Sequence, residues 1–150
     1  MKLLFFFIYT IIVAVAFALW EIQIEGKDGW AAKLPCWRKN EGTLVKIFGS
    51  PITGYHVFLV INLILLVHLP IFFVSQWTWS NELAILGFFL LTLTLEDFFW
   101  FVFNPAFGVK NFKKTNPNIW WHQRWFLGLP LLYWLGFPVG IILILVGSLD

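Results

Sequence analysis

Charged side chains are scarce in this sequence. Lysine, arginine, aspartate and glutamate make up 12% of its 150 residues, about half of the ~25% that is usual in soluble domains. The basic residues form no continuous stripe and the formal net charge is only +2, so nucleic acid is not an expected partner. Because 60% of the residues are hydrophobic, the composition favours a membrane protein over a soluble domain.

Cysteine and the common catalytic motifs are also nearly absent. Cys36 is the single cysteine, which excludes an internal disulfide and any metal site built from several cysteines. The sequence has no Walker phosphate-binding loop, no Gly-X-Ser-X-Gly nucleophile turn and no His-Glu-X-X-His zinc motif. Any chemical site must therefore be assembled from residues that lie far apart along the chain.

Four long segments are almost free of charge, and they comprise residues 3–20, 57–74, 83–103 and 125–147. A membrane-spanning helix needs roughly 20 mostly apolar residues, and its backbone must satisfy its own hydrogen bonds in lipid. The sequence therefore predicts an all-α membrane protein, a four-transmembrane-helix bundle that forms one domain over residues 1–150. Ala16-Phe17-Ala18 is compatible with signal-peptide cleavage, but we expect the first segment to be retained because it is long enough to span.

The basic residues are distributed unevenly between the connections. The connection after the first segment holds Lys27, Lys33, Arg38, Lys39 and Lys46, and the one after the third holds Lys110, Lys113, Lys114 and Arg124. The only other basic residue is Lys2, and residues 75–82 contain none. Cytoplasmic loops collect lysine and arginine, so we expect both long connections in the cytoplasm and both termini on the non-cytoplasmic side.

The first long connection admits two interpretations near its start. Glu21-Ile22-Gln23-Ile24-Glu25 alternates polar and apolar residues, which is compatible with a strand. A continuation of the first apolar helix is also compatible, and it would place Glu21 and Glu25 on one face at i, i+4. Pro35 and Pro51 interrupt the rest of the connection, so we expect it to form a compact interfacial cytoplasmic cap.

Two adjacent acids, Glu96 and Asp97, lie inside the third apolar segment. Counted from Phe103, they are about 10 Å into the membrane at the helical rise. A charge at the centre of a membrane helix costs roughly 2.5–3.5 kcal/mol on insertion scales. These carboxyl groups therefore require a basic partner, a polar cavity or a proton.

The histidines are the natural counterparts of these acids. His122 lies among Trp120, Trp121 and Trp125 in a chain that contains ten tryptophans, and tryptophan favours the membrane interface. If the acids and histidines converge, Glu96, Asp97 and His122 are candidate catalytic residues. His56, Glu96 and His122 are candidate ligands of a divalent metal. The alternative is interfacial anchoring by the tryptophan-rich segment and ordinary interhelical hydrogen bonds from the histidines.

Two further sets have simpler interpretations. Lys113, Lys114 and Arg124 are candidates for binding lipid headgroups at the cytoplasmic surface. Gly136 and Gly140 form a Gly-X-X-X-Gly pair in the fourth segment, which allows another helix to approach closely. That helix can belong to the same chain, to a second copy in a homo-oligomer or to a partner membrane protein.

These features leave three functions open. The first expectation is a multi-pass membrane protein of structural or interaction type, whose polar intramembrane residues hold helices or a partner together among membrane lipids. The first alternative is a membrane-embedded enzyme that acts on a lipid or isoprenoid near the inner leaflet. The second alternative is a proton or cation pathway through Glu96 and His68.

Overall fold

The computed structural model describes residues 2–73 and 77–148, which are mostly helical. In these residues the helices are α1 (Lys2–Glu25), α2 (Thr43–Phe48), α3 (Gly54–His68), α4 (Trp79–Phe103) and α5 (Leu131–Gly147), with short 3-10 helices η1 (Leu69–Phe72) and η2 (Val109–Asn111). The strands are β1 (Arg38–Lys39), β2 (Ile52–Thr53), β3 (Trp125–Phe126) and β4 (Leu129–Pro130). They pair as two short antiparallel ladders, β1 with β2 and β3 with β4. The fold is therefore not purely α, because these ladders shape the connections.

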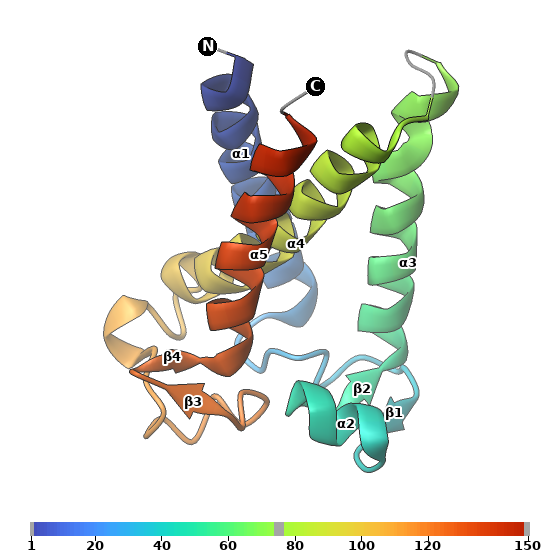
Figure 1. Cartoon of the computed structure of the whole chain (residues 1–150). Helices are drawn as coiled ribbons and strands as arrows, with labels where there is room; N and C mark the ends of the chain where they lie inside the picture. Colours follow the sequence, from blue (N-terminus) through green and yellow to red (C-terminus); the bar gives the residue numbers. More distant parts are fainter. Residues whose placement is uncertain (1, 74–76, 149–150) are drawn as a thin grey trace.

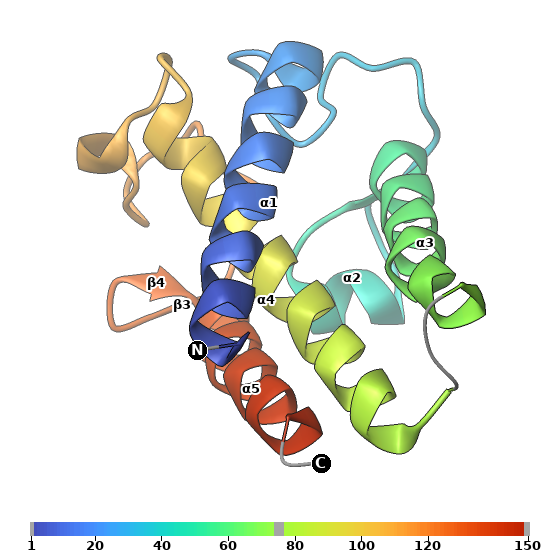
Figure 2. The ribbon, with the colours of Figure 1, turned by 90° about the horizontal axis from the view of Figure 1, so that it is seen from above.

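Helix α4 is the central element (Figure 1). It crosses the molecule at a steep angle and packs along both α1 and α5, whereas α3 stands to one side and contacts α4 much less (Figure 2). Helix α1 begins and α5 ends at one end of the molecule, and the short strands and α2 gather at the opposite end. We call this opposite end the strand end.

In the described part of the chain, three helical segments are long and apolar enough to cross a membrane. They are Lys2–Glu25, Gly54–Phe72 and Trp79–Phe103, which confirms the apolar helices expected in the first three segments. Helix α5 is also apolar but has 17 residues, so it is only about 25 Å long at the helical rise. The fourth span of the expected bundle stays a prediction.

The fourth apolar segment does not begin as a helix, which corrects the predicted boundary at Trp125. Residues 125–130 form the β3–β4 hairpin instead. Its turn holds Leu127 and Gly128 in the left-handed region, at φ 47° and 84°. Pro130 then precedes α5 in a non-helical conformation, at φ −54° and ψ 139°, and the residue before a proline also avoids helical geometry. The helix therefore begins at Leu131.

Residues 21–25, at the start of the first long connection, are helical. Helix α1 continues to Glu25, so the strand interpretation of residues 21–25 is wrong. The helix ends where the Gly26 N–H bonds to the carbonyl of Ile22 at 2.9 Å, with Gly26 at φ +61° in the left-handed conformation that glycine adopts most easily. Glu21 and Glu25 therefore share one face of α1.

Glycines bring α4 and α5 into close contact. A Cβ atom added to Gly87 would lie 2.7 Å from the carbonyl oxygen of Gly140, and one added to Gly136 would collide with Thr94 Oγ1. Gly147 is as tightly enclosed, because its Cβ would lie 2.5 Å from the Ser80 carbonyl oxygen. The Gly136 and Gly140 pair is therefore used for packing within the chain.

An aromatic cluster closes the strand end of the molecule. Its buried members are Ala18, Ile22, Trp100, Phe101, Phe107, Ile119 and Trp121. The ring of Trp121 stacks on Phe101 with centroids 5.7 Å apart. Asn104, just after α4, donates from Nδ2 to the Gly26 carbonyl at 2.8 Å. These contacts fix the end of α1, the end of α4 and the segment that carries His122 against one another.

Gly87→Ala tests the close packing of α4 against α5. Alanine raises helix propensity by about 1 kcal/mol, but its methyl group would collide with the Gly140 backbone. We expect a net destabilisation of about 1–3 kcal/mol from this overpacking, measured by thermal unfolding in detergent. The control is Ile142→Ala at a side chain on the exposed surface of α5, where little change is expected. An unchanged or raised melting temperature in Gly87→Ala would contradict this packing.

Candidate functional site

A polar cavity of about 250 Å³ lies between α1, α3, α4 and α5 near the strand end. Its ionisable lining residues are Glu21, Glu25, His56, Glu96, Asp97, His122 and Tyr133, and the rings of Trp30, Trp100 and Trp121 complete its wall. Four carboxyl groups and two histidines from segments far apart in the sequence therefore face one space. No lysine or arginine is among the described lining residues.

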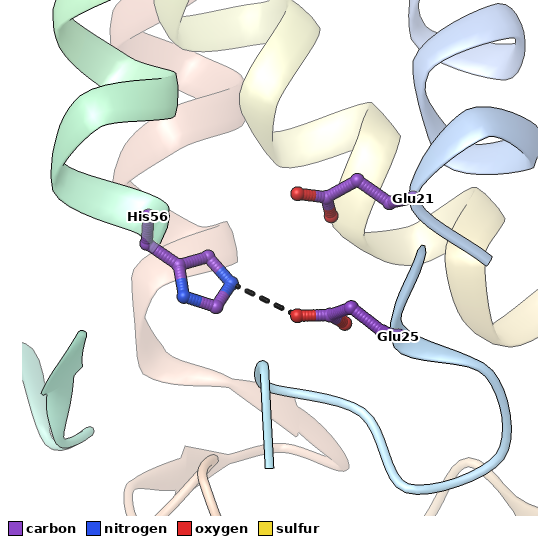
Figure 3. Close-up of side chains that lie close together, drawn as sticks. All are labelled: Glu21, Glu25 and His56. Atoms are coloured by element: carbon purple, nitrogen blue, oxygen red, sulfur yellow. Dashed lines mark ion pairs between the residues drawn. The ribbon is translucent and has the colours of Figure 1, made fainter. Parts of the chain in front are cut away.

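Helix α1 supplies two of the carboxyl groups from one face. Glu21 is buried, at 5% exposed, and the Glu25 side chain is 4% exposed. Glu25 Oε1 accepts the Ala31 N–H at 2.5 Å and lies 3.3 Å from His56 Nε2. In Figure 3 Glu21, Glu25 and His56 point toward one another from α1 and α3.

The turn after α1 is held in an unusual conformation. Trp30 and Ala31 both adopt positive φ, at 47° and 50°, which costs of order 1–3 kcal/mol for each non-glycine residue. The Arg38 guanidinium donates to the carbonyl groups of both residues, and Trp30 Nε1 donates to the Pro51 carbonyl at 2.8 Å. This turn places the Ala31 N–H on Glu25.

His56 is held from three sides in the first turn of α3. Thr53 caps this helix by accepting the His56 N–H at 3.2 Å. The Thr53 Oγ1 also lies 2.6 Å from His56 Nδ1, and the Trp30 ring stacks on the imidazole with centroids 4.1 Å apart. These contacts leave Nε2 directed at the carboxyl groups of α1.

Asp97 and His122 form a second, separate pair in the cavity wall. His122 Nε2 lies 2.9 Å from Asp97 Oδ2, and the Tyr133 hydroxyl donates to the same carboxylate. The His122 side chain is 7% exposed and lies among aromatic rings that include Trp121 and Trp125. A carboxylate close to an imidazole is a common feature of general acid–base sites.

Glu21 and Glu96 are carboxyl groups of this cavity whose hydrogen bonding is incomplete. Both line the same space, and both are buried, at 5% and 8% exposed. Within the described residues, Oε1 of each carboxyl group makes no hydrogen bond. Two buried carboxylates repel each other strongly in a low dielectric, so a proton or a cation must neutralise them.

The three residues that the sequence grouped as metal ligands, His56, Glu96 and His122, all line this cavity, but the two histidines have different partners. His56 lies with Glu21 and Glu25, whereas His122 is paired with Asp97. The sequence placed Glu21 and Glu25 on one face only if the first helix continues past the apolar segment, which it does. Tyr133 was missed, since a tyrosine in an apolar segment resembles an ordinary packing residue.

The remaining candidates lie outside this cavity. Lys113, Lys114 and Arg124 are exposed, and headgroup binding by them stays a prediction. His68 lies at the other end of α3, where its Nε2 is 3.2 Å from Glu82 Oε1. These two side chains are paired with each other. Glu96 and His68 are therefore not neighbours.

Comparison with known protein families, curated proteins and solved structures finds no match for this chain. The geometry of the cavity is the sole basis for a functional assignment.

Asp97→Asn tests the importance of the second pair. The substitution keeps the shape of the side chain but removes the negative charge beside the buried His122 ring and the Tyr133 hydroxyl. Because weakening a hydrogen bond to a charged group costs about 1.5–3 kcal/mol, we expect a clear fall in melting temperature in detergent.

The matched control is Glu82→Gln, which alters a carboxylate–histidine pair whose histidine is more open: the His68 side chain is 26% exposed, whereas that of His122 is 7% exposed. We expect a loss below about 1 kcal/mol there. Equal losses of stability in the two variants would show that the Asp97 pair contributes no more to stability than the Glu82 pair does.

Proposed function

We propose that this protein is a membrane-embedded enzyme that acts on a lipid or isoprenoid amphiphile, with the polar cavity as its active site. The observation that carries the proposal is the convergence of four carboxyl groups and two histidines on one space of about 250 Å³. Perturbed, closely placed ionisable groups in a cavity are the usual mark of a catalytic site.

The purely structural alternative accounts less well for this arrangement. Polar residues that hold membrane helices together pair with one another across the interface, as His68 and Glu82 do. Glu21 and Glu96 instead each present a carboxyl oxygen without a hydrogen-bond partner among the described residues. An unsatisfied buried acid costs stability, and a binding or catalytic role explains why it is present.

The substrate class is supported by a second, apolar cavity. This cavity of about 500 Å³ lies between α1, α3 and α4 and is lined mainly by phenylalanine, leucine, isoleucine and valine side chains. Leu93 lines both cavities. On α4, Thr92 faces the apolar cavity and Glu96, one turn later, faces the polar one. A hydrocarbon chain fits the former and a polar headgroup the latter, so the ligand is an amphiphile.

In this proposal His122 exchanges a proton with the headgroup. Asp97 faces its Nε2, which leaves Nδ1 as the nitrogen available to the substrate. Tyr133 holds the Asp97 carboxylate in place, so the two residues position the imidazole. General acid–base catalysis by one positioned group contributes typically about 10²–10⁴-fold to the rate.

His122→Gln tests the catalytic role. The protein is purified in detergent, incubated with a total lipid extract from its expression host, and lipid conversion is followed by mass spectrometry. We expect the wild type to convert a chain-bearing lipid and His122→Gln to lose about 10²–10⁴-fold of this turnover. His68→Gln, at the opposite end of α3, should retain it.

Retained folding of each variant is checked by thermal unfolding and size exclusion. Equal turnover in His122→Gln and the wild type would contradict the catalytic role of this imidazole. Absence of any conversion by the wild type, together with unfolding of the cavity variants, would favour the structural alternative.

We also infer that the strand end faces the cytoplasm and that both termini lie on the non-cytoplasmic side. The two connections that carry nine of the ten basic residues (all except Lys2) both lie at this end. The positive-inside rule places such connections in the cytoplasm. The active site would then open near the inner leaflet, and a four-span, multi-pass arrangement in which α5 crosses as well accounts for all of these positions.

Cysteine labelling tests this orientation. Cys36 lies in the first long connection and is partly exposed. A membrane-impermeant maleimide should label it only after the cells are lysed. In a Cys36→Ser background, Trp79→Cys at the start of α4 should be labelled in intact cells, because it lies at the opposite end. Ready labelling of Cys36 in intact cells would reverse the orientation.

A further inference from the structure

We propose that the polar cavity binds a divalent transition-metal ion through Glu21, Glu25 and His56, with Glu96 lining the same cavity. This inference goes beyond the proposed enzyme function, because it rests on the ligand geometry and does not require turnover. It also replaces the ligand set expected from the sequence, since His122 is not a member.

The three ligand side chains already surround a common point. One ligand atom from each of Glu21, Glu25 and His56 lies within 4.8 Å of the other two. The side chains point toward one another from α1 and α3 (Figure 3). An ion about 2.1 Å from each atom would hold the ligand atoms roughly 3–4 Å apart. Small rotations of the carboxylate side chains are enough to reach that spacing.

A carboxyl group of α4 supplies independent evidence for a cation in this cavity. Glu96 comes from a different helix, is more than nine-tenths buried and lines the same cavity. Its Oε1 has no hydrogen-bond partner among the described residues, and neither does Oε1 of the neighbouring Glu21. No described lysine or arginine lines the cavity to neutralise them, and a cation between the carboxyl groups would do so.

The surrounding contacts hold the ligands as outer-shell contacts do in metal sites. A metal-binding histidine commonly donates its other ring N–H to an oxygen, and Thr53 Oγ1 lies 2.6 Å from His56 Nδ1. With the proton on Nδ1, the Nε2 lone pair faces the carboxyl groups of α1. The Ala31 N–H holds Oε1 of Glu25, and the strained turn that provides this N–H is stabilised by Arg38.

The ligand types indicate which ions are favoured. Imidazole suits zinc, iron and other transition metals, while carboxylates accept manganese as well. Magnesium and calcium prefer all-oxygen surroundings, and His56 contributes nitrogen. We therefore expect Zn²⁺ or Mn²⁺ to bind more tightly than Mg²⁺ or Ca²⁺.

The experiment measures metal binding without any substrate. Full-length protein in detergent is stripped with a chelator and titrated with ZnCl₂ and MnCl₂ by calorimetry, with the metal-dependent rise in melting temperature as a second readout. We expect one ion per chain. Glu21→Gln and His56→Gln should weaken binding at least about tenfold, since loss of outer-shell contacts alone costs 10–100-fold.

Two variants serve as controls. Glu82→Gln alters another acid that faces a histidine but is remote from the cavity, and it should bind the ion as the wild type does. His122→Gln should lose lipid turnover but keep metal binding. That result separates this inference from the proposed function, because each can fail while the other holds.

A direct spectroscopic measurement covers the case in which a ligand variant does not fold. Mn²⁺ bound to the wild-type protein should show nitrogen hyperfine coupling from His56 by electron spin echo spectroscopy. Failure of Zn²⁺ and Mn²⁺ to bind, tighter binding of Mg²⁺ or Ca²⁺, absence of nitrogen coupling, or an equal loss of binding in Glu82→Gln would each overturn the proposal.

Discussion

Buried negative charge at the strand end is the constraint on which the rest of this structure depends. Glu21, Glu25, Glu96 and Asp97 are brought together in one cavity, where each buried charge must be neutralised or shared. Asp97 meets this requirement through the His122 imidazole and the Tyr133 hydroxyl. Glu21 and Glu96 do not, because Oε1 of each makes no hydrogen bond within the described residues. A bound ligand would supply the partner that these two carboxyl groups lack.

The connections between the helices help to position the side chains that line this cavity. The turn after α1 keeps Trp30 and Ala31 at positive φ, and strain of this kind persists only when surrounding contacts over-determine it. Arg38 and Pro51 provide those contacts. At the other side, the β3–β4 hairpin delays α5 until Leu131, which sets Tyr133 in the helical turn that reaches Asp97.

The helices are packed closely in one part of the molecule and loosely in another. Helices α4 and α5 approach closely because Gly87, Gly140 and Gly147 leave no room for a Cβ atom, and close van der Waals contact is the main force between helices in lipid. Helix α3 packs much less extensively on α4, and the apolar cavity lies along that looser boundary. In the proposed function, this loosely packed boundary is where a hydrocarbon chain would lie, away from the α4–α5 contact.

Hydropathy and charge are local properties of a segment, so the sequence alone was enough to predict the first three apolar helices and to place Glu96 and Asp97 within the third of them. It did not determine which acids meet which histidines. That choice required α1 to continue five residues past Trp20 to Glu25, so that two acids share a face. It also required the segment after α4 to fold back and set His122 against Asp97. Both outcomes depend on contacts between distant segments, such as Asn104 with Gly26, and these exist only in the folded chain.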